Sequence, residues 1–272
     1  MNVGGAGIST VLITGAAGRI GTTVCVGLQR GGWKVRGTDL AALPEEVPGA
    51  SADLTEPSSE AVLAELLDGA DAVLHLAGIA GEDTWSRILA ANIDATQRVL
   101  AAAREAGVRR VVLASSNHAT GFTRRSATGP LPADAAPRPD TFYGVSKVAL
   151  EALGALYVER HGMDVVALRI GSFLPRPHAP RHLATWLSPA DTVRLAHAAL
   201  TAPSPGFAQV WGISANSRAW WSPDAGHALG YYPADDAEVY ASEILSDGEP
   251  DWTGDEMLAL VGGDFATREP LT

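Results

Sequence analysis

The chain alternates short apolar runs with longer stretches in which apolar residues recur every three or four positions. A continuous apolar run is typical of a strand buried on both faces, whereas three- and four-residue spacing is typical of a helix. The alternation therefore predicts a parallel sheet whose strands are connected by helices. Strands are expected at 10–14, 34–38, 71–76, 108–114, 164–169 and 208–213, with a short one at 50–54, and helices at 19–30, 58–68, 86–106, 142–160 and 190–201.

Three parts of the chain depart from this rhythm. Residues 121–141 and 175–180 are rich in Pro, Ala and Arg and are expected to be loops. From residue 214 onward the alternation is lost and aromatic residues gather, which indicates a small appended lobe whose tryptophans serve packing. We expect one nucleotide-binding domain over 1–272, with substrate-binding elements at about 171–188 and 214–272.

Composition narrows the class of protein. The 272 residues are 46% apolar, which suffices for a packed core, and carry a net charge of −11, which disfavours nucleic acid and anionic membranes as partners. No apolar run approaches the roughly 20 residues needed to span a bilayer. The first basic residue is Arg19 and the one cysteine is Cys25, so we expect neither a secretory signal nor an internal disulfide, and a cytoplasmic location. A homo-oligomer is left open.

A glycine-rich turn follows the first predicted strand directly and opens the first predicted helix. Residues 14–21 read Thr-Gly-Ala-Ala-Gly-Arg-Ile-Gly. Gly15 permits a tight turn, Gly18 lets the backbone approach a pyrophosphate, and Gly21 allows close helix packing, while the helix N-terminus offers free N–H donors. An ordinary strand-to-helix turn is the alternative, which makes the next strand decisive.

That second strand ends at Asp39, 18 positions beyond Gly21, where dinucleotide-binding folds place an acidic residue about 20 positions on. A carboxylate there accepts hydrogen bonds from the adenosine ribose and repels a 2′-phosphate. NAD is therefore favoured over NADP. Arg36 precedes the strand tip and carries little weight for a phosphate.

Candidate reactive groups lie in the second half of the chain. Tyr143 and Lys147 share one face of a predicted helix, and an ammonium beside a phenol stabilises the phenolate, which makes tyrosine a usable general base. Ser115 and Ser116 follow a buried strand at its carboxyl end, where parallel sheets bind ligands. One of these serines can hydrogen-bond the reacting hydroxyl. Each residue alone could serve packing, a turn or a solvated surface; together they point to a catalytic site.

Together with 53–54, 74–78 and Asn92, these motifs resemble the extended short-chain dehydrogenase/reductase family, which includes NAD-dependent epimerases and dehydratases. The resemblance covers the whole chain. It implies a Rossmann-type, doubly wound parallel sheet with a small C-terminal substrate lobe, and catalytic roles for Tyr143, Lys147, Ser116 and Asn92, the last supporting a proton relay through the lysine. The cofactor residues it implies are Gly15, Gly18, Arg19, Ile20, Gly21, Asp39, Asp53, Leu54, Leu76, Ala77, Gly78, Asn92, Tyr143 and Lys147.

A narrower resemblance rests on 115–118, 169–172, 181–186 and the segment 210–221. These stretches are similar to family members that oxidise the anomeric carbon of galacturonate or glucuronate with NAD to an aldarolactone. Where such enzymes carry a serine that helps hold substrate, this chain has Ala80, which leaves the preferred sugar open. The substrate-binding residues that this resemblance implies are Ser116, Asn117, His118, Tyr143, Ser172, Arg181 and Phe265.

The implied substrate is a small anionic sugar, and Arg181 suits it. A guanidinium fork in a desolvated pocket binds a carboxylate bidentately in a way that lysine cannot reproduce. Arg181 follows the loop 175–180 and could also be an ordinary exposed arginine. His178 and His182 have a spacing that would suit a metal, but Pro177 and Pro180 prevent a regular helix there, so no metal is expected.

Two other functions remain as alternatives. A nucleotide-sugar epimerase or dehydratase would use the same NAD-binding half, but the short stretch 214–272 leaves little chain to hold a nucleotide diphosphate. A dinucleotide-sensing protein without catalysis would keep the fold, but the pairing of Tyr143 with Lys147 argues against it.

Overall fold

The apolar runs form the strands of a parallel sheet, because each is buried on both faces by helices. The computed structural model describes residues 10–269. The strand order is β3-β2-β1-β4-β5-β6-β9, and every neighbouring pair is parallel. The strands are β1 (Thr10–Thr14), β2 (Lys34–Asp39), β3 (Gly49–Ser51), β4 (Ala72–His75), β5 (Arg110–Ser116), β6 (Asp164–Ile170) and β9 (Phe207–Gly212).

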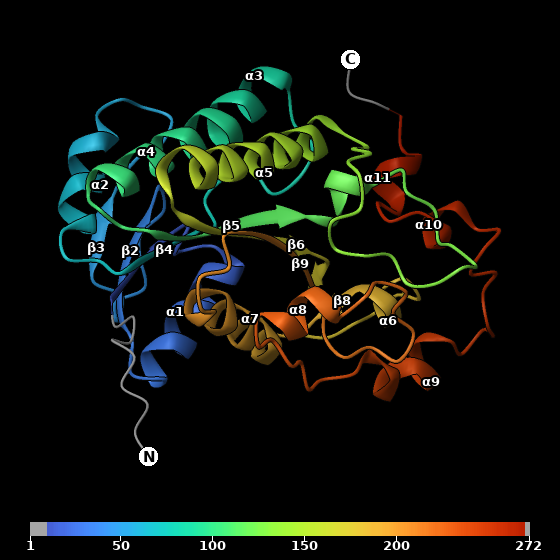
Figure 1. Cartoon of the computed structure of the whole chain (residues 1–272). Coiled ribbons are helices and arrows are strands. Elements are labelled where there is room, and N and C mark those ends of the chain that lie inside the picture. The colour runs from blue at the N-terminus through green and yellow to red at the C-terminus, as the bar shows by residue number, and fades with distance from the viewer. Residues whose placement is uncertain (1–9, 270–272) are drawn as a thin grey trace.

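Helices cover both faces of this sheet, which confirms the predicted doubly wound Rossmann-type fold (Figure 1). One apolar core lies between the sheet and the pair α1 and α7, and a second lies between the sheet and α2, α4 and α5. The bounds are α1 (Arg19–Arg30), α2 (Ser59–Leu67), α4 (Ala95–Glu105), α5 (Phe142–His161) and α7 (Pro189–Thr201).

Local signals set the ends of the two helices nearest the site. At the start of α5 the Thr141 hydroxyl accepts a hydrogen bond from Gly144 N–H, and at its end Gly162 adopts a left-handed conformation with φ of 63°. At the start of α7, Ser188 accepts from Asp191 N–H and Pro189 occupies the first turn. These caps fix where the side chains of α5 begin their helical spacing.

Beyond β9 the chain forms the expected lobe, which lies beside the carboxyl end of β5 (Figure 1). Tryptophans of the lobe pack, as predicted: Trp221 stacks on Trp211 of β9 with 4.4 Å between ring centroids, and Trp220 is also buried, as is Trp186 earlier in the chain. The lobe and its neighbouring segments contain β7 (Ser172–Phe173), α6 (His182–Thr185), β8 (Trp186–Leu187), α8 (Asp224–Ala228), the short 3-10 helix η3 (Ala237–Tyr240), α9 (Ala241–Ile244), α10 (Glu256–Ala259) and α11 (Asp264–Thr267).

The helix expected over 86–106 differs from the prediction. It consists of α3 (Trp85–Ile88), a wider π-helical turn η1 (Leu89–Asp94) and α4. The short strand expected at 50–54 pairs only over Gly49–Ser51. Within residues 10–269 no helix is both long enough and apolar enough to cross a membrane. The expectation about a secretory signal concerns the N-terminal end, and residues 1–9 lie outside the described part.

Candidate active site

A cavity of about 540 Å³ opens at the carboxyl ends of the strands. It lies where β1 and β4 are neighbours and the strand order changes direction. It runs from the glycine-rich turn to the start of α5, so it brings together residues predicted separately for cofactor binding and for catalysis. The predicted residues that line it are Gly15, Gly18, Arg19, Ile20, Gly21, Asp39, Asp53, Leu54, Leu76, Ala77, Gly78, Ser116, Tyr143 and Lys147.

The glycine-rich turn is packed closely at two positions where a side chain would clash with the backbone. Gly15 has a φ of +70°, and a Cβ atom there would lie 2.7 Å from Ala77 N. A Cβ on Gly21 would lie 2.1 Å from the Gly15 carbonyl oxygen, so only glycine lets α1 pack this closely. The first turn of α1 has no side-chain cap, which leaves its N–H groups for a ligand. These features fit a pyrophosphate of NAD.

Asp39 is held in an orientation that suits a ribose. One carboxylate oxygen accepts from Ala17 N–H and the other from Ala41 N–H, each at 2.9 Å. Asp39 lines the cavity, and each of its carboxylate oxygens can still accept a further hydrogen bond. Arg36 turns away and donates to the carbonyls of Leu66 and Asp68 at the end of α2. Asp39 and Arg36 therefore fit NAD better than NADP, which carries a 2′-phosphate on this ribose.

The short segment after β3 lines the cavity, and the family resemblance implies that it contacts adenine. Asp53 accepts hydrogen bonds from the hydroxyl and the N–H of Thr55, which lower the pKa of its carboxyl group. Leu54 lines the cavity with Asp53, as the family resemblance implies.

Asn92 lies behind the wall rather than on it. Its side-chain oxygen accepts from Ile79 N–H at 2.7 Å, and its amide nitrogen donates to Ile79 O and Ser146 Oγ. In the described part of the chain its amide hydrogen bonds go to these two residues and not to Lys147. The structure therefore shows Asn92 holding the loop after Gly78, and its part in a proton relay stays a prediction.

Tyr143 and Lys147 are both buried at the start of α5. The Lys147 Nζ atom donates to the Ala114 carbonyl at 2.7 Å. Burial lowers the pKa of Lys147 to about 8, although the charge of Glu151 opposes this shift.

The pKa of Tyr143 differs from the expectation. It is raised, chiefly by burial and further by the charge of Asp140, while a hydrogen bond with Ser116 lowers it. The Lys147 ammonium, which donates to the backbone of β5, does not reverse this direction in the structure.

The two serines after β5 have different surroundings. Ser115 donates to Glu151 at 2.6 Å, and Glu151 forms a buried ion pair with Arg169 behind the cavity. Ser116 shares a hydrogen bond with Tyr143. Both serines line the cavity, but Ser115 is tied to Glu151, so the contact with a reacting hydroxyl stays a prediction for Ser116.

Several residues predicted to bind substrate are tied to the C-terminal lobe. Asn117 Nδ2 donates to the Val261 carbonyl at 2.8 Å. The Arg181 guanidinium donates to the carbonyls of Leu260, at 3.0 Å, and Val261. Burial lowers the pKa of Arg181 to about 10, while Asp264 and Asp140 raise it. Arg181 lies outside the lining of the 540 Å³ cavity, so its contact with a substrate stays a prediction. Ser172 Oγ lies 2.8 Å from Thr185 Oγ1.

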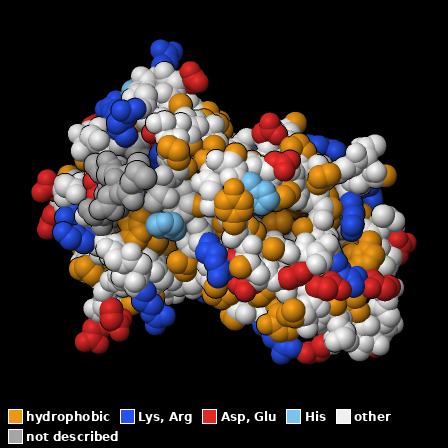
Figure 2. Space-filling view, turned by 60° about the horizontal axis from the view of Figure 1, so that its bottom comes forward, with side chains coloured by type: hydrophobic (Ala, Val, Ile, Leu, Met, Phe, Trp, Pro, Cys, Tyr) orange, Lys and Arg blue, Asp and Glu red, His pale blue; other side chains and the backbone are white. Residues whose placement is uncertain are grey.

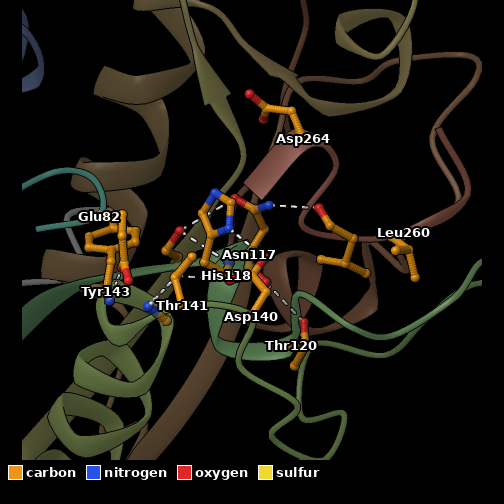
Figure 3. A network of polar contacts seen from close by, with 12 residues as sticks. Glu82, Asn117, His118, Thr120, Asp140, Thr141, Tyr143, Leu260 and Asp264 are labelled. Atoms are coloured by element: carbon orange, nitrogen blue, oxygen red, sulfur yellow. Dashed lines mark hydrogen bonds and ion pairs between the residues drawn. The ribbon is translucent and has the colours of Figure 1, made fainter. Parts of the chain in front are cut away.

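His118 lies beside Asn117 and Asp140 (Figure 3). Its ring stacks on Phe265 with 4.4 Å between centroids and meets the Tyr143 ring edge at 5.7 Å. Its Nδ1 lies 2.8 Å from the Asp140 carboxylate. The lobe thus reaches the predicted base through Phe265 and His118.

Two acidic residues of this network were not predicted. Glu82 accepts from the N–H groups of Phe142, at 3.1 Å, and Tyr143, at 2.9 Å, and so binds the N-terminus of α5 (Figure 3). Asp140 pairs with His118. Sequence reasoning missed them because their partners are distant in sequence. The one sequence signal was the pair Asp140-Thr141 directly before the helix, which is typical of an N-terminal cap.

The surface adds little positive charge to attract a large anion. On the face in Figure 2 the Lys and Arg side chains are scattered among Asp and Glu. A local cation such as Arg181 would therefore have to recognise an anionic substrate against a net charge of −11.

Comparisons with known proteins agree with this geometry. Residues 11–208 match the model of the NAD dependent epimerase/dehydratase family. The chain is 34% identical over 262 residues to uronate dehydrogenase of Pseudomonas putida, covering 96% of this chain and 97% of that protein. It is 36% identical over 261 residues to an NAD-dependent glucose-6-phosphate dehydrogenase of Haloferax volcanii, covering 88% and 97%.

A solved structure gives the same picture. A mutant uronate dehydrogenase from Agrobacterium tumefaciens, complexed with NAD, superposes with a TM-score of 0.86 at 34% identity and covers 96% of this chain and 98% of that one.

Proposed function

The chain belongs to the NAD-dependent epimerase/dehydratase family, and from that premise we propose that it oxidises C1 of a free hexuronate, galacturonate or glucuronate, to the aldarolactone. Its cofactor is NAD and it is an oxidoreductase. The observation that carries the proposal is the single cavity that joins Asp39 and the glycine-rich turn to Tyr143, Lys147 and Ser116.

The reaction removes a proton and a hydride from the cyclic sugar. The C1 hydroxyl loses its proton to Tyr143, and the C1–H bond gives up its electron pair, so that the hemiacetal carbon becomes the lactone carbonyl. NAD, when bound, supplies the hydride acceptor. Ser116 holds the reacting hydroxyl beside Tyr143, with which it shares a hydrogen bond.

Lys147 supplies positive charge beside the phenol. Its Nζ atom lies 5.2 Å from the centroid of the Tyr143 ring, and a positive charge at that distance favours a phenolate. Because burial raises the pKa of Tyr143, this compensation is needed for proton removal.

Arg181 is proposed to hold the uronate carboxylate. Its three hydrogen bonds within the described residues go to backbone carbonyls, which leaves other guanidinium N–H groups for an anion. The charges of Asp264 and Asp140 raise its pKa, and Asp140 is also the partner of His118, which supports a common site for Arg181 and His118.

One comparison supports a neighbouring substrate class. The 36% identity to a glucose-6-phosphate dehydrogenase fits a sugar whose anion is a phosphate rather than a carboxylate. Both substrates place an anion at C6, and the same arginine could meet either.

A panel of sugars separates these proposals. The full-length chain is incubated with NAD and, in turn, galacturonate, glucuronate, glucose 6-phosphate, galactose, glucose and a nucleotide sugar, and NADH absorbance is followed. We expect NADH with the two hexuronates. NADH with glucose 6-phosphate alone would favour the sugar-phosphate reaction, and redox-neutral conversion of the nucleotide sugar would favour an epimerase. NAD binding without turnover on any sugar would favour a sensor.

A further inference from the structure

Asp140 is a carboxylate enclosed by three separate parts of the chain. Its side chain has no exposed surface. Cβ atoms built on Gly121, Gly144 and Gly262 would lie 2.0, 3.0 and 1.8 Å from its oxygens. The loop after β5, the first turn of α5 and the C-terminal lobe therefore all leave space for this one side chain.

Few groups bind this carboxylate. One oxygen lies 2.8 Å from His118 Nδ1, and the other accepts from the Thr141 hydroxyl at 3.0 Å. A buried carboxylate with so few donors depends strongly on each of them. If His118 presented the lone pair of Nδ1, two acceptors would face each other at 2.8 Å. The pair is favourable when Nδ1 carries the hydrogen.

This constraint determines what the other side of the ring offers. Among the described residues, none forms a hydrogen bond with His118 Nε2. In the neutral imidazole only one nitrogen carries hydrogen, so a hydrogen on Nδ1 makes Nε2 an acceptor. Phe265 and Tyr143 both contact the His118 ring, so the ring that carries Nε2 is held next to the predicted base.

The position of Asp140 carries a cost for the reaction. Its charge raises the pKa of Tyr143 and so disfavours the phenolate. It also faces Arg181, whose pKa it raises, and this cation offsets part of its burial. What Asp140 contributes despite this cost is its hydrogen bond with His118 (Figure 3).

We propose that Asp140 is a positioning residue that fixes His118 in the Nδ1–H tautomer and thereby makes Nε2 an acceptor for a sugar hydroxyl. The assignment of the tautomer stands on the chain alone, whereas the sugar hydroxyl rests on the proposed function. A hydroxyl that donates to Nε2 is then required of the substrate, and a sugar with hydrogen or a methyl ether at that position binds poorly.

The tautomer is measured directly on the full-length chain without ligand. Two-bond ¹H–¹⁵N NMR of the imidazole rings at pH 8 distinguishes the two neutral tautomers, and His118→Gln identifies the His118 signals by their loss. We expect Nδ1–H in the wild type. An Nε2–H tautomer, or a ring protonated on both nitrogens, overturns the proposal. The tautomer itself is read from the wild type, and His118→Gln serves only to assign the signals.

Asp140→Ala removes the acceptor, and the smaller alanine side chain fits within the space that the surrounding glycines leave for aspartate. We expect His118 to lose its fixed Nδ1–H state. Asp191→Ala is the matched control, because Asp191 also has no exposed side-chain surface and accepts from the N–H groups of Ala234 and Asp235. The control should leave the His118 signals unchanged even if it lowers Tm. An unchanged tautomer in Asp140→Ala overturns the proposal.

Kinetics test the second half. In Asp140→Ala, kcat/KM for the oxidised hexuronate should fall by about tenfold to a hundredfold, with the Kd for NAD unchanged. Asp140→Asn should recover part of the loss, because its amide oxygen can still accept from Nδ1–H. Equal kcat/KM in Asp140→Ala and wild type overturns the role toward the sugar. If the wild type oxidises no hexuronate, the proposed function fails while the measured tautomer still decides the role of Asp140.

Discussion

Lys147 Nζ lies 5.2 Å from the centroid of the Tyr143 ring, yet its hydrogen bond goes to the carbonyl of Ala114. The lysine is thus a fixed charge next to the phenol rather than its hydrogen-bond partner. The direct partner of the phenol is Ser116. If Tyr143 is the base as proposed, the group that takes the proton and the group that stabilises the resulting charge are therefore different side chains.

Tyr143→Phe removes the proposed base and keeps the ring. We expect kcat to fall by at least about two decades, because removing a general base typically costs 10²–10⁴-fold, while the Kd for NAD stays near the wild-type value. Stopped-flow formation of NADH and titration of NAD by fluorescence measure the two quantities. Tyr157→Phe, a buried tyrosine later in α5, is the control and should keep wild-type turnover. Near wild-type kcat in Tyr143→Phe would show that another group takes the proton.

Lys147→Met should stabilise the fold at neutral pH. Folding lowers the pKa of Lys147 from 10.5 to about 8 through burial, so between these values the unfolded chain binds more protons and the free energy of unfolding rises with pH. Below pH 8 the whole penalty is present, about 3 kcal/mol. We expect urea unfolding at pH 7 to show the variant more stable, and the gain to shrink toward pH 10.

The chain offers a matched control for this measurement, since its lysines are Lys34 and Lys147 alone. Lys34 is exposed at the start of β2, so Lys34→Met should change the free energy of unfolding little at either pH. A Lys147→Met variant less stable than wild type at pH 7 would mean that the bond to Ala114 outweighs burial.

Asp39→Ala should weaken the preference for NAD. The variant loses the proposed hydrogen bonds to the ribose and the charge that repels a 2′-phosphate, so kcat/KM for NAD should fall by roughly tenfold while the ratio of NADP to NAD efficiency rises. Asp68→Ala, an exposed acid at the end of α2, serves as the control with an unchanged ratio. A wild type that prefers NADP would contradict the role of Asp39.

Arg181→Ala should lower kcat/KM for the hexuronate by at least roughly tenfold, because a charge-assisted hydrogen bond is lost and the carboxylate is left unpaired. Arg181→Lys should recover only part, since the planar fork is lost. Steady-state assays compare hexuronates with the neutral sugars galactose and glucose. Arg176→Ala, an exposed arginine paired with Glu243, is the control and should leave both unchanged.

The structure adds a second effect to that prediction. Arg181 also donates to the carbonyls of Leu260 and Val261, so Arg181→Ala should lower Tm as well. Equal losses on charged and neutral sugars would assign Arg181 to support of the lobe alone.

The fold followed from local patterns because its determinants are local. The helix expected over 19–30 is α1 with the same bounds, and each long strand lies within about two residues of its expected range. The helix expected over 86–106 is interrupted by a π-helical turn. Asn92 lies in this turn and accepts a hydrogen bond from the N–H group of Ile79, which lies outside the helix. Spacing within the helix carries no sign of that partner.

The candidate site was predictable where a motif joins neighbours in sequence, as in the glycine-rich turn and in Tyr143 with Lys147. Contacts across long separations were not. The partners of Asn117 and Arg181 at Val261 are 144 and 80 residues away. The direction of the Tyr143 pKa depends on burial and on Asp140, which no spacing rule reports.

The Val261 carbonyl accepts hydrogen bonds from both Asn117 and Arg181, two side chains proposed to meet the sugar. If the sugar draws these donors as proposed, it competes with the C-terminal lobe for them, and substrate binding is then linked to lobe attachment. Such linkage is reciprocal, so a change that loosens the lobe is expected to change sugar affinity in the same measure. On that proposal, the attachment of the C-terminal lobe is one of the quantities that set how tightly the active site holds its substrate.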